Sequence, residues 1–423
     1  MTTIAYDAKR LVRNRTGLGN YSRTLVNDLQ RQLPKDYSML LYAPDKGSDD
    51  LRSQVTETER LKYVYPEKAR SGVARAVWRS WGIVKDLKRD HVDIYHGLSG
   101  ELPIGIKASG IKSVVTIHDL IFLRHPEYYN PIDAAVYKAK FLLTCREADR
   151  IIAISECTKR DIMEYGNVDS ARIDVIYQSC AGRFSSKLTQ ESVETTKQRL
   201  HLPTRFVLNV GTIEERKNIG LAVNALPKLP EDIHLVVVGR RTKYTESVEK
   251  TAKKLGVADR LHILSGIDDN DLQAIYQLAE TFVYPSRYEG FGIPIIEAIQ
   301  SGLPVVACTG SCLEEAGGPD SLYVSPDDPV MLAGAIKQTL KDAGGRKERI
   351  KSSRMYVKRF ENNDTAKRVI DSYKRQWIIV HCLLFFYNFI FLFSNLSRSF
   401  TAFSTVAFAS HPRLMAYCRM KYS

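Results

Sequence analysis

Cysteine is scarce in this chain of 423 residues, and its placement excludes two kinds of cross-link. The seven cysteines are odd in number and widely scattered, which does not suit a disulfide framework. Only Cys308 and Cys312 lie close together, and no histidine or second cysteine pair completes a structural zinc set. We therefore expect thiols in the core or in loops of a protein in a reducing cytoplasm.

Motifs for nucleic-acid recognition and for export are also missing. The formal net charge is +13, but the basic residues are spread along the chain and form no RNP motif, zinc finger or basic-region heptad. We expect no nucleic-acid partner; the charge is interpreted as a solvated basic face, with peripheral membrane association as the next reading. Because strand-like Thr2–Asp7 follows Met1 directly, we expect no signal peptide and a cytoplasmic location, at the inner face of the membrane if the protein associates with one.

Long apolar runs are lacking until residue 377. Trp377–Phe393 is nearly all apolar but shorter than the about 20 residues of a typical membrane-spanning helix, and it contains His381 and Asn388. Residues 376–423 therefore form an atypical, aromatic-rich tail. Three readings of this tail stay open, namely a membrane anchor, a helix that packs on a partner, and a fortuitous extension.

Short apolar runs alternate with amphipathic stretches, and the pattern occurs twice. Runs such as Ile4–Tyr6, Val92–Tyr95 and Val114–Ile117 resemble strands in the first half. The alternation restarts near residue 205 with Arg205–Val210 and His234–Val238. Continuous apolar strands between helices are typical of doubly wound parallel sheets. The sequence thus predicts an α/β protein with two Rossmann-like halves, joined at the polar segment Ser185–Thr204.

Two carboxylates bracket a glycine-rich turn in the second half. The segment Tyr284–Ala298 leaves a strand, turns through Gly290 and Gly292 and enters a helix. Exposed amides at a helix start bind anions such as a pyrophosphate, and Glu289 and Glu297 can accept hydrogen bonds from sugar or ribose hydroxyls. The alternative is a structural strand–helix turn with one incidental acid.

Other polar residues stand at the ends of predicted strands. Arg216 and Lys217 follow one strand and precede a helix, which suits neutralisation of a leaving diphosphate, although such pairs are also common on surface turns. His118 stands at the end of another predicted strand. A histidine in this position can donate a hydrogen bond to a ligand, shuttle a proton, or have a structural role only. The first loop contains Gly17 and Gly19 but lacks the third glycine of a dinucleotide fingerprint, so it predicts close backbone approach to a phosphate or sugar rather than a Rossmann cofactor.

Taken together, these motifs resemble the retaining glycosyltransferases of family 4, in their mannosyltransferase-like group 1. The pattern is E-x7-E at Glu289 and Glu297, with Gly17-Leu-Gly-Asn-Tyr, Thr116-Ile-His-Asp-Leu and Arg216-Lys217-Asn before it. The resemblance covers roughly residues 1–375. It implies the GT-B fold, with two facing Rossmann-like domains and a deep interdomain cleft, and it implies no metal or other cofactor. Where the family usually has Pro-Asn-Gly, this chain has Tyr177-Gln-Ser-Cys.

The resemblance also implies that the two halves of the chain have different roles. Residues 1–190 would form the acceptor-side domain, 191–360 the donor-binding domain, and 361–375 a helix that crosses back to the first domain. The residues expected at the reaction centre are His118, Arg216, Lys217 and Glu289. The further donor-binding residues are Gly17, Gly19, Gly239, Arg240, Gly290, Phe291, Gly292, Ile293 and Glu297. The residues expected on the acceptor side are Asn20, His96, Ser99 and Glu101.

The activity expected is transfer of a hexose, with retention, from a nucleotide-diphosphate sugar to a glycan or lipid-linked acceptor. GDP-mannose is the first donor to consider, and UDP-glucose and other UDP-hexoses follow. Two alternatives remain: a nucleotide-sugar epimerase, which needs no sugar acceptor, and a non-catalytic nucleotide-sugar-binding protein of the same fold.

Overall fold

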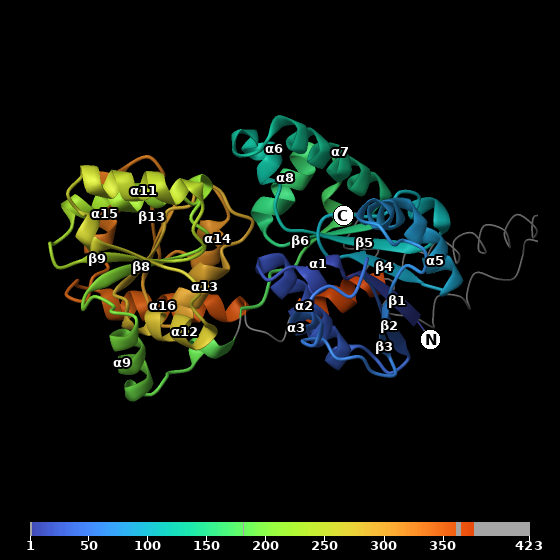
Figure 1. Cartoon of the computed structure of the whole chain (residues 1–423), viewed down its shortest axis with the longest axis horizontal. Coiled ribbons are helices and arrows are strands. Elements are labelled where there is room, and N and C mark those ends of the chain that lie inside the picture. The colour runs from blue at the N-terminus through green and yellow to red at the C-terminus, as the bar shows by residue number, and fades with distance from the viewer. Residues whose placement is uncertain (1, 181, 361–364, 376–423) are drawn as a thin grey trace, which may run out of the picture. The chain divides into compact units, whose positions relative to one another are not determined.

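Two all-parallel sheets organise the chain, one in each half (Figure 1). The computed structural model describes residues 2–180, 182–360 and 365–375. The first sheet has seven strands in the order β3-β2-β1-β4-β5-β6-β7, and the second has six in the order β10-β9-β8-β11-β12-β13. Helices alternate with the strands in both halves, so the α/β class predicted from the alternating pattern is confirmed.

The first half contains the elements β1 to β7 and α1 to α8. Its strands are β1 Thr2–Asp7, β2 Tyr37–Tyr42, β3 Leu61–Val64, β4 Ile94–Gly97, β5 Lys112–Ile117, β6 Arg150–Ala153 and β7 Ile173–Val175. Its helices are α1 Lys9–Arg13, α2 Gly17–Gln32, α3 Asp49–Arg52, α4 Gly72–Val77, the π-helical turn η1 Trp78–Gly82, α5 Ile83–Arg89, α6 Ile121–Arg124, α7 Pro131–Glu147 and α8 Glu156–Gly166.

The second half contains the elements β8 to β13 and α9 to α16. Its strands are β8 Phe206–Val210, β9 His234–Val238, β10 Leu261–Leu264, β11 Thr281–Tyr284, β12 Val305–Cys308 and β13 Leu322–Val324. Its helices are α9 Gln190–Arg199, α10 Ile219–Ala225, α11 Lys243–Lys254, α12 Asp269–Leu278, α13 Ile293–Gln300, α14 Leu313–Gly317, α15 Pro329–Lys337 and α16 Arg346–Val357.

Each sheet has a point where the strand order reverses. β1 lies between β2 and β4, and β8 lies between β9 and β11, so the loops that leave these neighbouring strands diverge to opposite faces. Ligands of open α/β sheets bind beyond the carboxyl ends of the strands at this switch point. The fold therefore singles out the loops after β1 and β4 in the first half, and those after β8 and β11 in the second.

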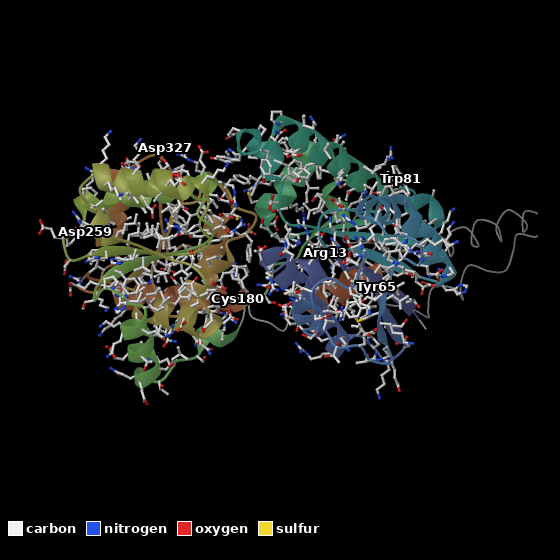
Figure 2. All side chains as sticks on the ribbon, in the orientation of Figure 1. Arg13, Tyr65, Trp81, Cys180, Asp259 and Asp327 are labelled. Carbon is white, nitrogen blue, oxygen red and sulfur yellow. The ribbon has the colours of Figure 1, made fainter. Side chains whose placement is uncertain are left out.

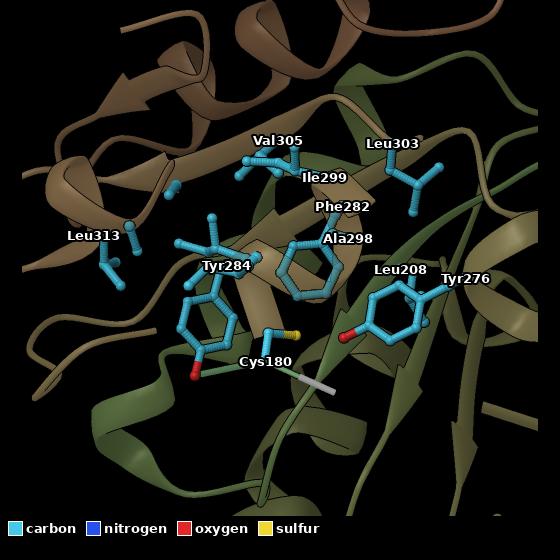
Figure 3. Packing of buried hydrophobic residues seen from close by; sticks show 14 of the residues in the cluster. Cys180, Leu208, Tyr276, Phe282, Tyr284, Ala298, Ile299, Leu303, Val305 and Leu313 are labelled. Carbon is cyan, nitrogen blue, oxygen red and sulfur yellow. The ribbon is translucent and has the colours of Figure 1, made fainter. Parts of the chain in front are cut away.

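A buried apolar cluster fixes the strands and helices around the second switch point. Figure 3 shows Tyr276 of α12, Phe282 and Tyr284 of β11 and Leu208 of β8 packed against one another and against α13. Tyr276 and Phe282 pack with ring centroids 5.7 Å apart. Such close packing holds the start of α13 in a fixed position relative to the sheet.

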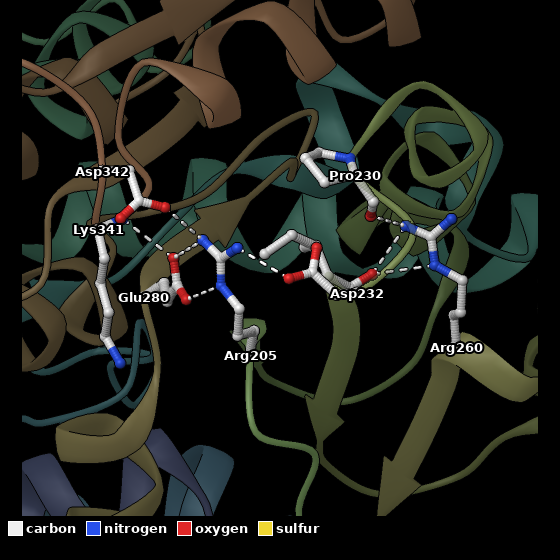
Figure 4. A network of polar contacts seen from close by, with 8 residues as sticks. Arg205, Pro230, Asp232, Arg260, Glu280, Lys341 and Asp342 are labelled. Atoms are coloured by element: carbon white, nitrogen blue, oxygen red, sulfur yellow. Dashed lines mark hydrogen bonds and ion pairs between the residues drawn. The ribbon is translucent and has the colours of Figure 1, made fainter.

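The opposite end of the same sheet is held by ion pairs (Figure 4). Arg205, directly before β8, donates from Nε to Glu280 Oε1 at 2.7 Å and from Nη1 to Asp232 Oδ2 at 2.8 Å. The Glu280 side chain is fully buried, and it also accepts a hydrogen bond from the Lys341 amide. A buried carboxylate is stable only with such partners, so this network fixes the amino ends of β8 and β11.

Residues 365–375 form a helix that packs on the first sheet, although they follow the second half in sequence. Ala366, Val369, Ile370 and Tyr373 are buried in the core cluster that contains β1, β2 and β4. Arg368 also donates to the Val175 carbonyl of β7 at 2.6 Å. The chain thus returns to its first half, and residues 361–364 of the predicted crossing helix lie outside the described residues.

The structure corrects two local expectations. The segment Ser185–Thr204 is not a plain linker, because it contains α9, whose Thr196 donates to Asp271 Oδ1 of α12 at 3.1 Å. The predicted strand Val92–Tyr95 begins later, at Ile94, although Asp93 already donates its amide to the Thr3 carbonyl and accepts the Lys112 amide. Within the described residues no helix is both long and apolar enough to cross a bilayer. Trp377–Phe393 lies outside that part of the chain.

Candidate active site

The loops after β8 and β11 meet at a buried ion pair. Lys217, in the short turn Glu215–Lys217 after β8, lies with its Nζ 2.5 Å from Glu289 Oε1 and 2.8 Å from the Tyr284 hydroxyl. Arg216 lies with its Nη1 3.0 Å from Glu289 Oε2, and it donates to the Tyr288 carbonyl at 2.7 Å. Three residues predicted at the reaction centre therefore form one cluster at the second switch point.

The cluster is shielded from water, which sets its charge state. The side chains of Arg216, Lys217 and Glu289 are 16%, 13% and 10% exposed. Burial by itself raises the pKa of Glu289, but Lys217 and Arg216 outweigh it and lower that pKa to about 2. Burial likewise opposes the charged form of Lys217, yet Glu289 raises the pKa of the ammonium above its ordinary value. These three residues together carry one net positive charge at neutral pH, and the more exposed Glu214 lies with its Oε1 2.7 Å from Arg216 Nη2 at the rim of the cluster.

The backbone between Glu289 and α13 is shaped by a glycine. Gly292 has φ +110°, a conformation that L residues with a side chain rarely adopt, and it stands directly before the first helical residue Ile293. Pro294 follows at the second helical position, where its missing amide costs nothing. The turn leaves the first amides of α13 beside the Glu289 loop, in the arrangement that binds phosphate oxygens.

Glu297 lies one turn inside α13 and differs from Glu289 in its electrostatics. The hydroxyl of Tyr276 donates to Glu297 Oε2 at 2.9 Å. Burial raises the pKa of Glu297 to about 7, although the Tyr276 hydrogen bond and Arg183 act to lower it. The pKa values of the two carboxylates of the E-x7-E pattern are therefore shifted in opposite directions. Glu289 is ionised at neutral pH, and Glu297 titrates near it.

The loop after β9 lies beside the loop after β8. A Cβ on Gly239 would come within 1.8 Å of the Gly211 carbonyl, so only glycine permits this close approach. Ile213 donates its amide to the Arg240 carbonyl at 3.0 Å, and the Arg240 side chain is exposed. Gly239 and Arg240 are thus placed at the carboxyl edge of the sheet, one strand away from Lys217.

His118 follows β5 and is held in one tautomer by two partners. Its Nε2 donates to the Leu98 carbonyl at 2.9 Å, so Nδ1 is the acceptor for the Gln178 amide at 2.8 Å. Burial lowers the pKa of His118 to about 4, which keeps the ring neutral. The ring also packs edge-on against Tyr21, with centroids 4.7 Å apart. A ligand at His118 would have to replace one of these hydrogen bonds.

The Gly290 loop contacts the segments after β5 and β6. A Cβ on Gly290 would lie 2.1 Å from the His118 carbonyl, and the Ser155 hydroxyl donates to the Gly290 carbonyl at 2.7 Å. The adjacent Phe291 ring stacks on Tyr177 at 5.4 Å. The backbone at His118 is therefore in direct contact with the loop that carries Glu289.

The first glycine motif is helical rather than a loop. Gly17 is the first residue of α2, and a Cβ on Gly19 would lie 1.8 Å from the Asn14 carbonyl. Asn20 accepts a hydrogen bond from Arg23 at 2.6 Å. The local prediction of a glycine loop is wrong, because the chain turns into the helix at Thr16 and Gly19 is needed for close packing.

The acceptor-side candidates separate into surface and core residues. Ser99 and Glu101 are half-buried beyond β4, at the first switch point. His96, in contrast, is completely buried in β4, with Nδ1 2.6 Å from the Tyr373 hydroxyl and Nε2 2.9 Å from Thr116 Oγ1. We correct its assignment: the C-terminal helix covers His96, both ring nitrogens are engaged, and burial lowers its pKa to about 3.

A cavity of about 220 Å³ lies beside Glu101. Arg79 bridges the carboxylates of Asp7 and Glu101, and Lys140 lies with its Nζ 3.2 Å from Glu101 Oε1. Apolar side chains, Leu102 among them, complete the lining. Charged groups next to apolar walls can hold a hydroxyl-rich ligand in one orientation.

Three residues that serve the site were not singled out in the sequence. Tyr284 and Tyr276 are hydrogen-bond partners of Lys217 and Glu297, and Gln178 is the partner of His118. Gln178 lies in the Tyr177-Gln-Ser-Cys segment that departs from the family pattern, which was the one available signal. Among the described residues, no group of three or more His, Cys, Asp or Glu side chains is placed to hold a metal ion.

Two family models match this chain, one in each half. The family model described as Glycosyl transferases group 1 matches residues 192–375, and that described as Glycosyltransferase Family 4 matches residues 15–179. The two matches cover both halves of the chain, including the Lys217–Glu289 cluster and His118. The chain belongs to the family 4, group 1 glycosyltransferases.

Among known proteins, the similarity includes bacterial mannosyltransferases. The chain is 29% identical over 330 residues to O-antigen chain mannosyltransferase B of Escherichia coli, covering 77% of this chain and 81% of that protein. It is 27% identical over 295 residues to the serotype-specific mannosyltransferase WbdA of the same species, covering 67% of this chain but 36% of the longer relative.

Solved structures share the two-sheet architecture. The Anabaena protein HepE in complex with UDP and glucose superposes with a TM-score of 0.70 at 16% identity, over 89% of this chain and all of that one. At this identity the likeness shows the fold alone. The fold is GT-B, as the motifs predicted.

Proposed function

We propose that this protein is a retaining hexosyltransferase that moves mannose from GDP-mannose to a glycan or lipid-linked acceptor in the synthesis of a cell-surface polysaccharide. The observation that carries the proposal is the buried Arg216–Lys217–Glu289 cluster at the second switch point, beside the first turn of α13. Its net positive charge and helix amides suit a diphosphate, and Glu289 suits sugar hydroxyls. The similarity to mannosyltransferases favours mannose over the UDP-hexoses.

Residues 191–360 bind the donor in this proposal. Arg216, Lys217 and the amides from Gly290 to Ile293 hold the diphosphate and sugar, while Glu297 accepts hydrogen bonds from the ribose. Gly239 and Arg240 lie by the base, at the edge that follows β9. The complex of HepE with UDP and glucose supports a nucleotide-sugar ligand for this fold.

The proposed mechanism of glycosyl transfer depends on where charge develops in the transition state. The bond between the anomeric carbon and the diphosphate oxygen breaks, and negative charge grows on the leaving group. Lys217 and Arg216 stabilise that charge more strongly in the transition state than in the ground state. The acceptor hydroxyl forms the new bond on the same face of the sugar and gives its proton to the leaving phosphate oxygen, which retains the anomeric configuration. His118 contacts the sugar near this centre.

Residues 1–190 receive the acceptor in this proposal. The cavity beside Glu101 lies at the first switch point, where open α/β sheets bind ligands. Glu101 forms ion pairs with Arg79 and Lys140 and retains lone pairs for sugar hydroxyls. Ser99, Asn20, Gly17 and Gly19 border the approach to the donor.

A donor panel tests the proposal. The full chain is incubated with GDP-mannose, UDP-glucose and UDP-galactose, with and without a chelator, while the melting temperature and the products are followed. GDP-mannose should raise the melting temperature, because a ligand of the folded state stabilises it, and should be cleaved slowly with or without chelator. Transfer to an α-configured product, seen by NMR, would establish retention.

The alternatives give different results in the same assay. An epimerase would release an altered sugar nucleotide without any acceptor. A non-catalytic binder would show the thermal shift but neither hydrolysis nor transfer. If no nucleotide sugar shifts the melting temperature, the assignment of the Lys217–Glu289 cluster as a donor site is wrong.

A further inference from the structure

A buried tyrosine of the first half has a hydroxyl group without a protein partner. Tyr95 of β4 is 1% exposed, and its hydroxyl forms no hydrogen bond to any of the described residues. Burial raises the pKa of Tyr95 well above its ordinary value, and the nearby Asp7 carboxylate adds to this shift. A buried polar group without a hydrogen bond is rare in folded proteins, so this hydroxyl calls for a functional explanation.

Tyr95 lines the cavity of about 220 Å³ beside Glu101. The walls of this cavity come from β1, β4, η1 and α7 and from the loop that follows β4. Sites for drug-sized ligands usually start at about 300 Å³, so the cavity is of a size for a single small ring. The Tyr95 hydroxyl can donate a hydrogen bond to such a ligand.

Four charged side chains line the cavity, and their charges cancel. Arg79 lies with its Nη1 3.3 Å from Asp7 Oδ2 and 2.6 Å from Glu101 Oε2, and Lys140 Nζ lies 3.2 Å from Glu101 Oε1. A phosphate or carboxylate would meet two carboxylates as well as two cations, so the lining favours an uncharged ligand. Hydroxyl groups can donate to the carboxylates and accept from the cations at the same time.

An exposed aromatic ring stands at the outer edge of the cavity. Trp81 lines the cavity and is 55% exposed, and Figure 2 labels it at the surface of this half. Its turn η1 is held in place, because Trp78 donates its indole N–H to Asp86 Oδ2 at 2.7 Å and the Ser80 carbonyl accepts the Ile104 amide at 2.8 Å. π-helical turns often occur at functional sites. A flat aromatic side chain can pack on the apolar face of a sugar ring while the hydroxyl groups of the sugar reach polar partners.

The cavity is separate from the predicted reaction centre. Among the described residues, no hydrogen bond or ion pair joins a side chain of the cavity lining to His118, Lys217 or Glu289. The two places are nevertheless close along the chain, because the Leu98 carbonyl accepts from His118 and Glu101 follows three residues later. Three residues span at most about 11 Å. A ligand that reaches from the cavity to His118 therefore needs to be no longer than a disaccharide.

We propose that the cavity is a distal acceptor subsite, which binds a neutral hexose ring next to the sugar whose hydroxyl attacks the donor. Trp81 packs on the face of this ring, Tyr95 donates to one of its hydroxyls, and Glu101 accepts from another. The acceptor is therefore a glycan of at least two sugars rather than a single sugar. The catalytic role of the subsite rests on the transfer proposed above, but sugar binding to the cavity can be measured without the donor.

Binding in the absence of donor tests the subsite directly. The full chain is mixed with a panel of α-linked mannobioses, and saturation-transfer NMR measures the Kd. Tyr95→Phe should raise the Kd about 3- to 10-fold at an unchanged melting temperature, because the hydroxyl that it removes has no protein partner to lose. Trp81→Ala should raise the Kd about tenfold.

Tyr42→Phe is the matched control. Tyr42 is also buried, but its hydroxyl donates to Asp90 Oδ2 at 2.6 Å and it does not line the cavity. This variant should lower the melting temperature, because it removes a hydrogen bond, and should bind mannobiose as the parent chain does.

Kinetics with the donor found in the panel test the position of the subsite. Mannobiose should be glycosylated, whereas methyl α-mannoside should inhibit competitively without being glycosylated, because it occupies the cavity and not the reaction centre. Tyr95→Phe should raise the KM for mannobiose by about the same factor as the Kd and affect kcat much less, since this contact is equal in the ground state and the transition state.

Several outcomes would overturn the proposal. Equal mannobiose binding by Tyr95→Phe and the parent, or no binding of any mannobiose by the parent, would exclude the cavity as a sugar site. Displacement of mannobiose by inorganic phosphate would assign the cavity to an anionic group. Equal kcat/KM for methyl α-mannoside and mannobiose would place the reacting sugar itself in the cavity. Mannobiose binding that depends on Tyr95, without a response to any nucleotide sugar, would keep the sugar site and reject the proposed transfer.

Discussion

At the level of single residues, Lys217 and Glu289 determine each other's charge. They lie seventy-two positions apart, and the buried carboxylate keeps the buried ammonium protonated. Paired buried charges are costly to desolvate, and replacing them by apolar groups often stabilises a protein. A buried ion pair of this kind is therefore weak evidence for a stabilising role, and it agrees with the donor-binding role proposed above.

Lys217→Ala and Arg216→Ala should lower kcat by about 100- to 1,000-fold, because each removes a cation from the developing charge on the leaving group. The melting temperature should be affected less than kcat, because the cation that remains in each variant still pairs with Glu289. Steady-state kinetics with the donor found in the panel, beside thermal unfolding, measures both. Lys254→Ala, an exposed position of α11, is the control. Unchanged kcat in both site variants would contradict the mechanism.

Glu297 should make donor affinity depend on pH near neutrality. Its pKa is raised to about 7 in the folded protein, and an ionised carboxylate accepts ribose hydrogen bonds more strongly than a protonated one. The Kd of the nucleotide sugar should therefore be constant above pH 7 and rise by up to about tenfold per pH unit below it. Titration calorimetry between pH 5.5 and 8.5 measures this, and Glu297→Gln should flatten the profile. A profile of the same slope in that variant would exclude Glu297 as the cause.

At the level of elements, the start of α13 depends on one backbone conformation. A Cβ at position 292 would lie 3.2 Å from Leu313 Cδ2, at φ +110°. Gly292→Ala should therefore destabilise the protein by about 1–3 kcal/mol and weaken donor binding, since the helix amides would shift. Thermal unfolding and the donor-induced thermal shift report the two effects.

Gly334→Ala is the matched control for this element. Gly334 lies in helix α15, and a Cβ there would meet nothing within 4 Å. Alanine should stabilise this helix by up to about 1 kcal/mol, because it loses less conformational entropy on folding. If both alanine variants changed stability in the same direction, the conformational argument for Gly292 would fail.

At the level of the whole molecule, the last described helix joins the C-terminal part of the sequence to the first sheet. Tyr373 is 1% exposed and closes the core over His96. Tyr373→Ala should cost about 3–5 kcal/mol, as for other large core side chains. Tyr373→Phe should cost about 1–3 kcal/mol, since it leaves His96 without one partner. Denaturant unfolding measures both, and the exposed Lys367→Ala should lie within about 0.5 kcal/mol of the parent. Equal stability of all three variants would contradict this role of the helix.

Much of the local structure could be predicted from the sequence, because it depends on neighbours along the chain. The expected strand His234–Val238 matches β9. Asp268 caps α12 by accepting the Asp271 amide at 2.8 Å, as Asp commonly does directly before a helix. Short strands such as β7 carry too little apolar pattern to be recognised, and α9 is so polar that it was interpreted as a linker.

The sequence by itself determined the α/β class, the family resemblance and the E-x7-E pattern, since periodicity, glycine positions and motif spacing are local properties of the chain. Only the tertiary structure decided that Lys217 meets Glu289, that the pKa values of Glu289 and Glu297 diverge, and that His96 is a core residue beneath Tyr373. Strand order and helix packing bring together residues that are far apart in sequence, and burial then determines their charge. Neither the tertiary contacts nor the resulting charge states can be read from motif spacing alone.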